Sequence, residues 1–472
     1  MAVFQNNLLA GAGAQSSDST HTIDQSIRFN SADSAVLNKT YSGAGSRTTF
    51  TFSCWLKVGD QTDSGSGFPL FNGGTGASDT GWTGIAYYRG TIYIQGYSTN
   101  WKLTTRKLLD PAAWYHIVWV WDTTNAVAVE RTRLYINGVR ETDFSTDNNP
   151  GASANAGIGQ AQQHSIGYQS RTVGWGYADA YFAEMVFLDG TATDCTSFGE
   201  FNSNGIWVPK DVSGLTFGTN GFHIDGRDSA DLGDDESGQG NDYTASGLAA
   251  HDQVLDSPTN NFCVMNSIEN VPCTFTQGNL TIDSTSNFSG AAIRGTVHIQ
   301  GGSTGKWYYE VVGSLTGDYF STGWMLSSII TPGSTVIGQD VGSVAFYNTG
   351  SYQNTTNAQG AITKPAAGDV IGVGLDASTG QVFLRDDSGY FVGTLSSNAL
   401  SSGVVITGFS GEDLVMASRN SSSGTATYNF GQDGTFAGAK TAQGNTDANG
   451  IGNFFYTVPD GFLAICTKNL GS

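Results

Sequence analysis

Short segments in which apolar and polar residues alternate recur along the first half of the chain. This period of two is typical of β-strands with one buried face. In FTFSCWLKV, residues 50–58, every even-numbered residue is apolar. RLYINGVRE, residues 133–141, reads as two strands joined by an Asn-Gly turn, the strongest short signal for a β-hairpin. Further strands are predicted in HTIDQSIRFNS (21–31), TIYIQGY (91–97), AAWYHIVWVWDT (112–123), HSIGYQ (164–169) and AYFAEMVFLDG (180–190).

Strand patterns return in the second half, after a stretch from 212 to 262 that is dominated by turns and by Asp and Gly. They are GKWYYEVVG (305–313), FSTGWMLS (320–327), SVAFYN (343–348), GDVIGVGLDASTGQVFLRD (368–386), DLVMASR (413–419), TATYNFG (425–431) and PDGFLAI (459–465). No segment keeps an amphipathic helical spacing over a dozen residues, and TDCTSFGEF (193–201) is predicted to form one helical turn. The two halves share no visible repeat, so the pattern predicts an all-β chain of two different antiparallel β-sandwiches.

The same patterns set the expected domain boundaries. We expect an extended N-terminal arm at 1–22, a first sandwich at 23–215, an Asp/Gly-rich connection at 216–262 and a second sandwich at 263–472. The arm contains one apolar knot, formed by Phe4, Leu8 and Leu9. We predict that this knot anchors the chain to a larger assembly.

Composition supports the all-β reading and argues against disorder. The 472 residues include 64 glycines, and aromatic residues make up 12% of the chain while charged residues make up 13%. Disordered chains are poor in aromatics, whereas aromatic segments separated by small polar turns are typical of β-proteins.

Charge and hydropathy limit the classes of binding partner and the cellular location that we expect. The net charge is −20, with 21 Lys and Arg against 41 Asp and Glu, which disfavours nucleic acid and anionic membrane surfaces. MAVFQNNLLAGAGAQSSDS has neither the basic start nor the apolar core of a signal peptide, and no apolar run reaches 18 residues. We therefore expect synthesis in the cytosol without membrane insertion.

Five cysteines, Cys54, Cys195, Cys263, Cys273 and Cys466, are irregularly spaced and form no CxxC motif. Reduced and mostly buried thiols are the simplest expectation. A disulfide between Cys263 and Cys273 is left open.

The first half resembles a laminin-G or concanavalin A-like lectin domain. The resemblance is carried by FTFSCWLK (50–57), WYHIVWVWD (114–122), RLYINGVRE (133–141), HSIGY (164–168) and AYFAEMVFLDG (180–190). In YADAYFAE, residues 177–184, the family's glycine is replaced but Glu184 is kept. The resemblance implies a concanavalin A-like jelly roll.

The second half resembles a SPRY domain. GKWYYEV (305–311), GDVIGVGLD (368–376), TGQVFLRDDSGYF (379–391), YNFGQ (428–432) and PDGFLAI (459–465) stand in that family's order. The stretch from 320 to 366 departs from the pattern. The resemblance implies a second sandwich whose loops meet a partner, and Tyr347, Tyr352, Arg385 and Tyr390 are the candidate residues, with ordinary loop positions as the alternative.

Motifs for enzyme chemistry are missing from the sequence. Concanavalin A-like glycosidases carry E-x-D-x-x-E on one strand, and this motif does not occur. Asp179 and Glu184 are five residues apart, so they face opposite sides of a strand, and Glu184 is expected to hydrogen-bond at the sheet edge. No HExxH occurs, and His116 is expected to be a structural residue.

Carbohydrate binding needs exposed aromatic faces and a few orienting polar groups. Aromatic residues in or beside Gly/Ser/Thr-rich loops of the first half are the candidates: Trp82, Tyr87, Tyr88, Tyr97, Trp101, Trp175 and Tyr177. Trp82, Tyr97, Trp101, Trp175 and Tyr177 are the predicted glycan-binding set. Subunit contact and loop packing are the alternative roles.

LGDDESGQGNDYT, residues 232–244, is an acidic turn in the expected connection. Read as an EF-hand from Asp235, it has Ser and Gln at positions three and five and Ser at position twelve, a partial match. No cofactor is expected beyond a structural calcium ion, for which Asp234, Asp235, Asn241 and Asp242 are the candidate ligands.

The order of the two modules, opening on MAVFQNNLL and IDQSIRFN, resembles a family of tail-fibre-like or structural bacteriophage virion proteins. The resemblance implies a non-enzymatic protein of the virion surface. It would attach to other virion proteins through the arm, form a homo-oligomer, with a trimer as our guess, and bind a host glycan or receptor. The alternatives are a capsid or tail decoration protein and, third, a glycan-degrading enzyme.

Overall fold

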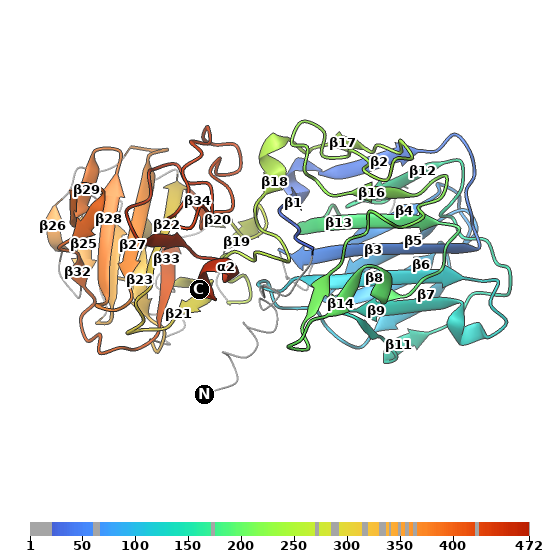
Figure 1. The fold of residues 1–472 in the computed structure, drawn as a ribbon, viewed down its shortest axis with the longest axis horizontal. Coiled ribbons are helices and arrows are strands. Elements are labelled where there is room, and N and C mark those ends of the chain that lie inside the picture. The colour runs from blue at the N-terminus through green and yellow to red at the C-terminus, as the bar shows by residue number, and fades with distance from the viewer. Residues whose placement is uncertain are drawn as a thin grey trace. The chain divides into compact units, whose positions relative to one another are not determined.

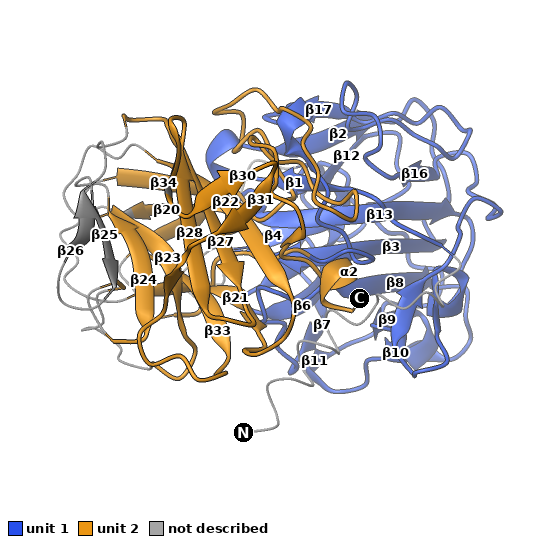
Figure 2. Cartoon of the chain, turned by 60° about the vertical axis from the view of Figure 1, so that its left-hand side comes forward, with its two compact units in different colours: residues 1–261 blue, residues 262–472 orange. Residues whose placement is uncertain are grey.

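The computed structural model describes residues 21–59, 67–170, 175–269, 273–284, 292–313, 320–329, 337–338, 341–347, 351–354, 358–361, 366–420 and 424–471. The chain separates into two compact units, residues 1–261 and 262–472, which Figure 2 colours differently. In the described parts both units are built from mainly antiparallel sheets, and helix is confined to single turns. The predicted all-β fold class is confirmed.

Two stacked sheets, A and B, form the first unit (Figure 1). The described strands of sheet A run in the order β10 (Val139–Arg140), β9 (Thr132–Ile136), β8 (Tyr115–Asp122), β3 (Thr49–Val58), β13 (Ala180–Asp189), β1 (Ser26–Phe29) and β18 (Gln253–Val254), with β16 (Phe222–Ile224) also pairing with β13. Those of sheet B run in the order β11 (Phe144–Asp147), β7 (Asn100–Thr104), β6 (Thr91–Gly96), β5 (Thr83–Tyr88), β4 (Phe68–Gly73), β12 (Gln163–Ile166), β2 (Val36–Thr40) and β17 (Thr244–Ser246). Short 3-10 turns lie at Ser31–Asp33, Ala128–Glu130, Cys195–Ser197 and Ala250–Asp252.

The main core of this unit lies between the two sheets. Alternation along β3 turns Phe50, Phe52 and Leu56 inward, where they are completely buried. The ring of Phe52 stacks on that of Phe71 from sheet B, with centroids 4.8 Å apart. Burying such a side chain contributes about 1.5–3 kcal/mol, so the period-two pattern of the sequence determines which face of each strand turns inward.

The other face of sheet A is covered as well. A hairpin of β14 (Gly199–Phe201) and β15 (Trp207–Pro209) packs there, and Trp207 belongs to a second buried cluster with Trp55 and Val118. A Cβ on Gly138 would lie 2.2 Å from the Trp207 ring, so only glycine fits at this turn position, whose φ is +77°.

Residues 216–261 are not a connection, which corrects the predicted boundary. β16 pairs with β13, β17 with β2 and β18 with β1, so this segment adds strands to both sheets. Phe222, Leu232 and Tyr243 enter the core. These strands have two or three residues each, too short to show an alternating pattern, and the Asp and Gly residues between them suggested only turns.

The predicted arm falls mainly outside the described residues, and so does the anchor of Phe4, Leu8 and Leu9. The first described residue, His21, hydrogen-bonds through Nε2 to Glu184 Oε2 at 3.0 Å. Among the described helices none is long and apolar enough to cross a membrane.

The second unit also has two principal sheets. In its described part, the first runs in the order β19 (Thr274–Thr276), β20 (Thr281–Ser284), β34 (Gly424–Asn429), β22 (Lys306–Gly313), β27 (Val370–Asp376), β28 (Gln381–Asp386) and β29 (Gly389–Val392); β32 (Val404–Val405) pairs with β28, and β35 (Phe462–Ala464) pairs in parallel with β22. The second runs in the order β21 (Ile293–Ile299), β33 (Leu414–Asn420), β23 (Phe320–Leu326), β24 (Ser343–Tyr347), β25 (Ser351–Asn354) and β26 (Ala358–Ala361). A hairpin of β30 (Thr394–Ser396) and β31 (Ala399–Ser401) and the helix α2 (Thr467–Leu470) complete it.

Side chains on the two faces of β22 contact different parts of the second unit. Tyr309 lies between the sheets and its hydroxyl hydrogen-bonds Thr322 of β23. Glu310 faces the other way and accepts hydrogen bonds from the backbone N–H groups of Phe455 and Tyr456, both at 2.8 Å. Burial raises the pKa of Glu310 to about 7, against the opposing effect of these bonds. A buried carboxyl thus holds the C-terminal segment on the sheet.

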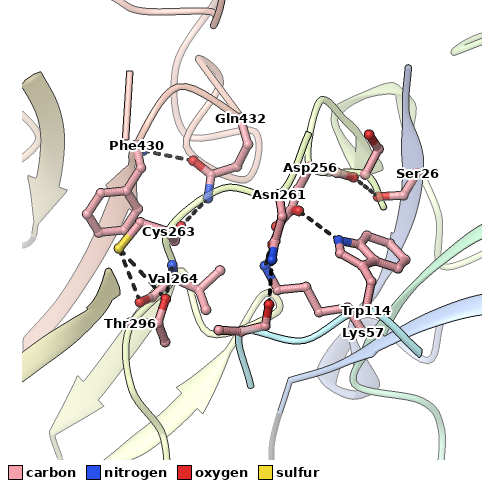
Figure 3. Close-up of polar contacts among 12 residues, drawn as sticks. Ser26, Lys57, Trp114, Asp256, Asn261, Cys263, Val264, Thr296, Phe430 and Gln432 are labelled. Carbon is pink, nitrogen blue, oxygen red and sulfur yellow. Dashed lines mark hydrogen bonds and ion pairs between the residues drawn. The ribbon is translucent and has the colours of Figure 1, made fainter. Parts of the chain in front are cut away.

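The five cysteines, all within the described residues, form no disulfide, so the Cys263–Cys273 bridge left open by the sequence is not made. Four of them are buried and Cys273 is half-buried. In the second unit Cys263 lies beside Thr296, and its carbonyl accepts a hydrogen bond from Gln432 (Figure 3).

Candidate functional site

Aromatic side chains gather on the face of sheet B that is turned away from the core. Along β6 the residues alternate strictly, with Ile92 and Ile94 buried in the core and Tyr93 on the opposite, half-buried face. Tyr88 at the end of β5 lies on that same face. The β5–β6 pairing therefore brings two tyrosines together outside the core.

Trp175 completes this group, which we call the aromatic platform: Tyr88, Tyr93 and Trp175. The Trp175 ring centroid lies 5.5 Å from that of Tyr88 and 6.1 Å from that of Tyr93, at interplanar angles of 77° and 52°. Tyr88 and Tyr93 are 6.0 Å apart. All three rings are half-buried, so each keeps part of its surface in solvent.

Backbone geometry holds Trp175 in place. The N–H of Gly176 donates to the carbonyl of Gly67 at 2.9 Å, and a Cβ on Gly67 would lie 2.7 Å from the Trp175 ring. Gly67 also has a φ of +68°, which other residues adopt at a cost. This glycine lets the indole ring lie directly against the backbone.

A buried amide fixes the loop that leads toward Trp175. Asn72 on β4 accepts hydrogen bonds from the N–H and the hydroxyl of Ser170, and its Nδ2 donates to the carbonyls of Ser165 and Tyr168. Asn72 is completely buried. A buried amide with all these partners rigidifies its surroundings, so residues 165–170 are ordered against sheet B.

Polar groups accompany the platform. Gln95 follows Tyr93 on the same face of β6, and its buried Nε2 has no hydrogen-bond partner among the described residues. Burial raises the pKa of Tyr93, with the neighbouring Tyr88 adding to the effect, so the phenol stays protonated and can donate or accept. Half-exposed rings beside such groups fit the apolar face and the hydroxyl groups of a sugar.

The predicted glycan-binding residues fall into a buried group and an accessible group in the structure. Trp82 and Trp101 are only 3% and 6% exposed, so placing them in a glycan site was wrong. Trp82 donates its indole N–H to Asn72, and Trp101 packs against Trp121 in the core. Both residues stand among residues typical of loops, yet their rings are buried by packing. The local sequence pattern does not predict this burial.

The other predicted aromatics differ in exposure. Tyr97 is 44% exposed beyond the end of β6, and Tyr177 is half-buried and stacks on Tyr168 with centroids 3.9 Å apart. Tyr87, also a candidate, points into the core. Tyr93 was missed because it stands in a strand, although the alternation of TIYIQGY already placed it opposite the core residues.

The predicted partner site of the second unit does not form a loop cluster. Tyr347 ends β24, is 2% exposed and donates its hydroxyl hydrogen to the Ile337 carbonyl at 2.6 Å. Tyr352 lies on β25, opposite Phe346. Arg385 and Tyr390 face each other on β28 and β29, and the Arg385 guanidinium lies 3.6 Å from the ring centroid of Tyr456. These residues belong to strands because the hairpins are longer than their turn residues suggested.

The acidic turn is organised around hydrogen bonds. The Asp235 carboxylate accepts from the N–H groups of His223, Ser237 and Asn241, while Asn241 Nδ2 donates to the carbonyls of Thr219 and Gly221. Asp242 Oδ1 accepts from the Asp235 N–H, and Asp234 is half-buried beside it. In the described part of the chain no three His, Cys, Asp or Glu side chains converge as metal ligands. Calcium at these four residues stays a prediction.

Among the described residues, Ser53 and His116 form a pair that looks like a catalytic serine with its base. Ser53 Oγ lies 2.8 Å from His116 Nε2, and Trp207 Nε1 donates to His116 Nδ1 at 3.0 Å. An indole N–H only donates, so the neutral imidazole carries its proton on Nε2 and donates to Ser53. Burial lowers the pKa of His116 to about 3. This geometry does not activate the serine, and it satisfies a buried histidine, as the sequence predicted.

Glu184 is buried in the middle of sheet A rather than at its edge. It sits at a bulge of β13, with a φ of +48°, where the strand's partner changes from β1 to β16. His21 and His223 hydrogen-bond its two oxygens at 3.0 and 2.5 Å. Asp179 is used separately, accepting from the N–H and hydroxyl of Ser31. The two acids do not form a glycosidase pair.

Comparison with known families agrees with this architecture. Residues 29–194 match the model of the concanavalin A-like lectin/glucanases superfamily, and residues 306–415 match the SPRY domain model. The chain thus contains a concanavalin A-like domain followed by a SPRY domain, as the resemblances implied. None of the curated proteins compared with the chain matches it.

Solved structures give distant similarities. The PSpry domain of TRIM65 shares 12% identity at a TM-score of 0.27, covering 36% of this chain and 92% of that one. The SPRY domain of human HERC1 shares 11% identity at a TM-score of 0.26, covering 35% and 96%. A "putative carbohydrate binding protein" from Bacteroides ovatus shares 16% identity at a TM-score of 0.33, covering 48% of this chain and 60% of that one. Similarity at this level assigns no function to the chain.

Proposed function

We propose that this protein binds a glycan without cleaving it and that the aromatic platform of Tyr88, Tyr93 and Trp175 is the binding surface. The observation that carries the proposal is the meeting of three half-exposed rings on the outer face of sheet B, within a concanavalin A-like domain. Such rings supply the apolar contact that sugars need, at little cost in conformational entropy. Gln95 follows Tyr93 on the same face of β6, with its Nε2 buried.

A glycan array tests this proposal. The intact chain should bind a restricted set of glycans, and Trp175→Ala should weaken that binding about tenfold or more, the effect expected for a central aromatic contact. Phe201→Ala is the control, because Phe201 is an aromatic residue with 54% of its surface exposed on β14, outside sheet B. Binding that survives Trp175→Ala unchanged contradicts the assignment.

We also propose that the chain is a surface protein of a bacteriophage particle, an appendage component displayed as a homo-oligomer, with a trimer as the simplest form. The order of the two modules supports this proposal, and Phe4, Leu8 and Leu9 would hold the chain on other virion proteins. Several copies would raise a weak glycan affinity by about 10²–10⁴. Cryo-electron microscopy of the particle tests the location, and a position flush with a capsid lattice contradicts the appendage assignment.

A decoration role is the second candidate, and one surface feature favours it. Val127, Val129 and Val139 are each more than half exposed. They lie close together at the β10 edge of sheet A, where Arg140 bonds to Glu130 and to the Val129 carbonyl. Apolar groups beside an unpaired edge suit contact with a neighbouring subunit. Val139→Lys that dissociates the oligomer while leaving glycan binding intact would support this role.

A further inference from the structure

Arg89 at the tip of the β5–β6 hairpin and Lys107 on the segment after β7 form no ion pair with an acidic side chain among the described residues. The turn runs through Arg89 and Gly90, with φ values of +50° and +85°, which is the geometry of a tight hairpin turn. The Leu108 N–H donates to the Gly90 carbonyl at 2.6 Å, and a Cβ on Gly90 would lie 3.5 Å from Cβ of Lys107. Arg89 and Lys107 therefore project from neighbouring backbone segments.

Other cations near these strands are neutralised. Lys102 pairs with Asp147 and also bonds to Asn149, and Arg106 pairs with Glu141 at 3.0 Å. Arg89 and Lys107 are both exposed, and neither forms an ion pair with any described residue. Asp110, nearby in sequence, uses its carboxylate to accept the Ala112 N–H. Two cations that form no ion pair within the described part of the chain are notable when the net charge is −20.

Arg89 lies within reach of the proposed sugar surface, and Lys107 lies on the backbone segment beside the Arg89–Gly90 turn. The Arg89 guanidinium carbon is 5.2 Å from the ring centroid of Tyr88, and the Tyr88 ring is 5.5 Å from that of Trp175. A sugar resting on Tyr93 and Trp175 would thus have a guanidinium at its margin. Guanidinium and ammonium groups bind carboxylate and sulfate through charge-assisted hydrogen bonds, which are stronger than neutral ones.

We propose that the aromatic platform selects acidic sugars, and that Arg89 and Lys107 bind the carboxylate or sulfate group of the glycan. This inference rests on the proposed function, since it names the class of glycan. The Debye length at physiological salt is about 8 Å. Attraction between the acidic group of the glycan and these two cations therefore outweighs repulsion of that group by more distant acidic side chains. Short oligosaccharides, which do not extend over that surface, show the preference best.

The test is calorimetric titration of the full chain with oligogalacturonate and with the same oligosaccharide after reduction of its carboxyl groups. We expect the acidic form to bind about tenfold more tightly, the value of one charge-assisted hydrogen bond. The double variant Arg89→Gln/Lys107→Gln should bring the ratio of the two affinities to about one. Lys210→Gln, which removes an exposed cation beyond β15, should keep the ratio of the wild type.

A sulfated oligosaccharide forms a third arm and separates sulfate from carboxylate as the preferred group; tight binding of either supports the inference. Equal affinity for the acidic and reduced sugars, or an acid preference that survives the double variant, overturns it while leaving the proposed glycan binding standing. Binding of none of the sugars on the array or in the titration overturns the proposed function as well.

Discussion

At the scale of single residues, packing between distant segments decides which aromatic side chains of the first unit stay accessible. GWTG and STNWK place Trp82 and Trp101 among turn residues, yet both rings are buried by contacts with segments distant in sequence. Trp175 and Tyr88 were predicted candidates, and their rings lie together in the structure, with centroids 5.5 Å apart. Burial depends on such long-range packing, which local pattern does not contain.

Asp256 is also buried by contacts with residues distant in sequence, and these contacts give a testable prediction. Its carboxylate accepts from Lys57 Nζ at 2.7 Å and from the Trp114 indole at 3.1 Å, and its carbonyl accepts from Ser26, all within the first unit (Figure 3). Lys57 and Asp256 are both completely buried. We expect Asp256→Asn to lower the free energy of unfolding of the first unit by about 3–5 kcal/mol, because a buried ammonium loses its carboxylate.

Urea unfolding of the two variants Asp256→Asn and Glu130→Gln measures this effect. Glu130 pairs with Arg140 on the surface, so its removal should cost no more than about 1 kcal/mol. Comparable losses in the two variants would show that the buried pair is not a major support of the fold.

At the scale of elements, alternation predicted the long strands and failed for the short ones. β3 and β13, with ten residues each, were recognised from their apolar pattern. β16, β17 and β18 have three residues or fewer, and their place in sheets A and B is set by their partners β13, β2 and β1. The acidic stretch between them is a turn of the first sandwich. In this turn the Asp235 carboxylate accepts hydrogen bonds from backbone N–H groups.

The bulge in β13 predicts a response to acid. Burial alone would raise the pKa of Glu184, but His21 and His223 outweigh it and lower the pKa to about 2. The hydrogen bond to Glu184 in turn raises the pKa of His21. A lowered carboxyl pKa stabilises the fold above the unfolded-state value of about 4.3 and this stabilisation is lost as pH falls toward 2.

We therefore expect the first unit to lose stability, on the order of 2–3 kcal/mol, between pH 4.5 and pH 2. The His21 contribution is full below about pH 6.5 and fades as pH rises through its raised pKa. Urea unfolding as a function of pH measures both limbs, and Glu184→Gln should flatten them. A Glu184→Gln profile with the same slopes as wild type would refute the assignment to this cluster.

At the scale of the whole molecule, the resemblances predicted two β-sandwiches in the right order. The predicted end of the first sandwich, at 215, is too early, whereas the predicted start of the second, at 263, lies one residue from the start of the second unit. The first compact unit ends at Asn261, because Phe222, Leu232 and Tyr243 help to fill its core. A composition-based boundary near 215 would remove strands from both sheets.

A truncated chain of residues 1–261 should therefore fold and unfold cooperatively, whereas residues 1–215 should not. Circular dichroism with thermal unfolding separates the two outcomes. Fragment 1–215 lacks β16, β17 and β18 and the buried side chains of Phe222, Leu232 and Tyr243. Loss of each large buried aromatic residue costs about 3–5 kcal/mol, so the combined loss is comparable to the whole free energy of unfolding of a typical domain. A fragment 1–215 that melts as sharply as 1–261 would contradict the place of residues 216–261 in the fold.

The most direct test of the central claim is calorimetric titration of the intact protein with a glycan that it retains on the array, repeated for the double variant Tyr93→Ala/Trp175→Ala. The aromatic platform predicts saturable binding by the wild type and by Phe201→Ala, and a loss of about a hundredfold or more in the double variant at unchanged thermal stability. Equal affinity of the wild type and the double variant for that glycan would contradict the assignment of the platform as the binding surface.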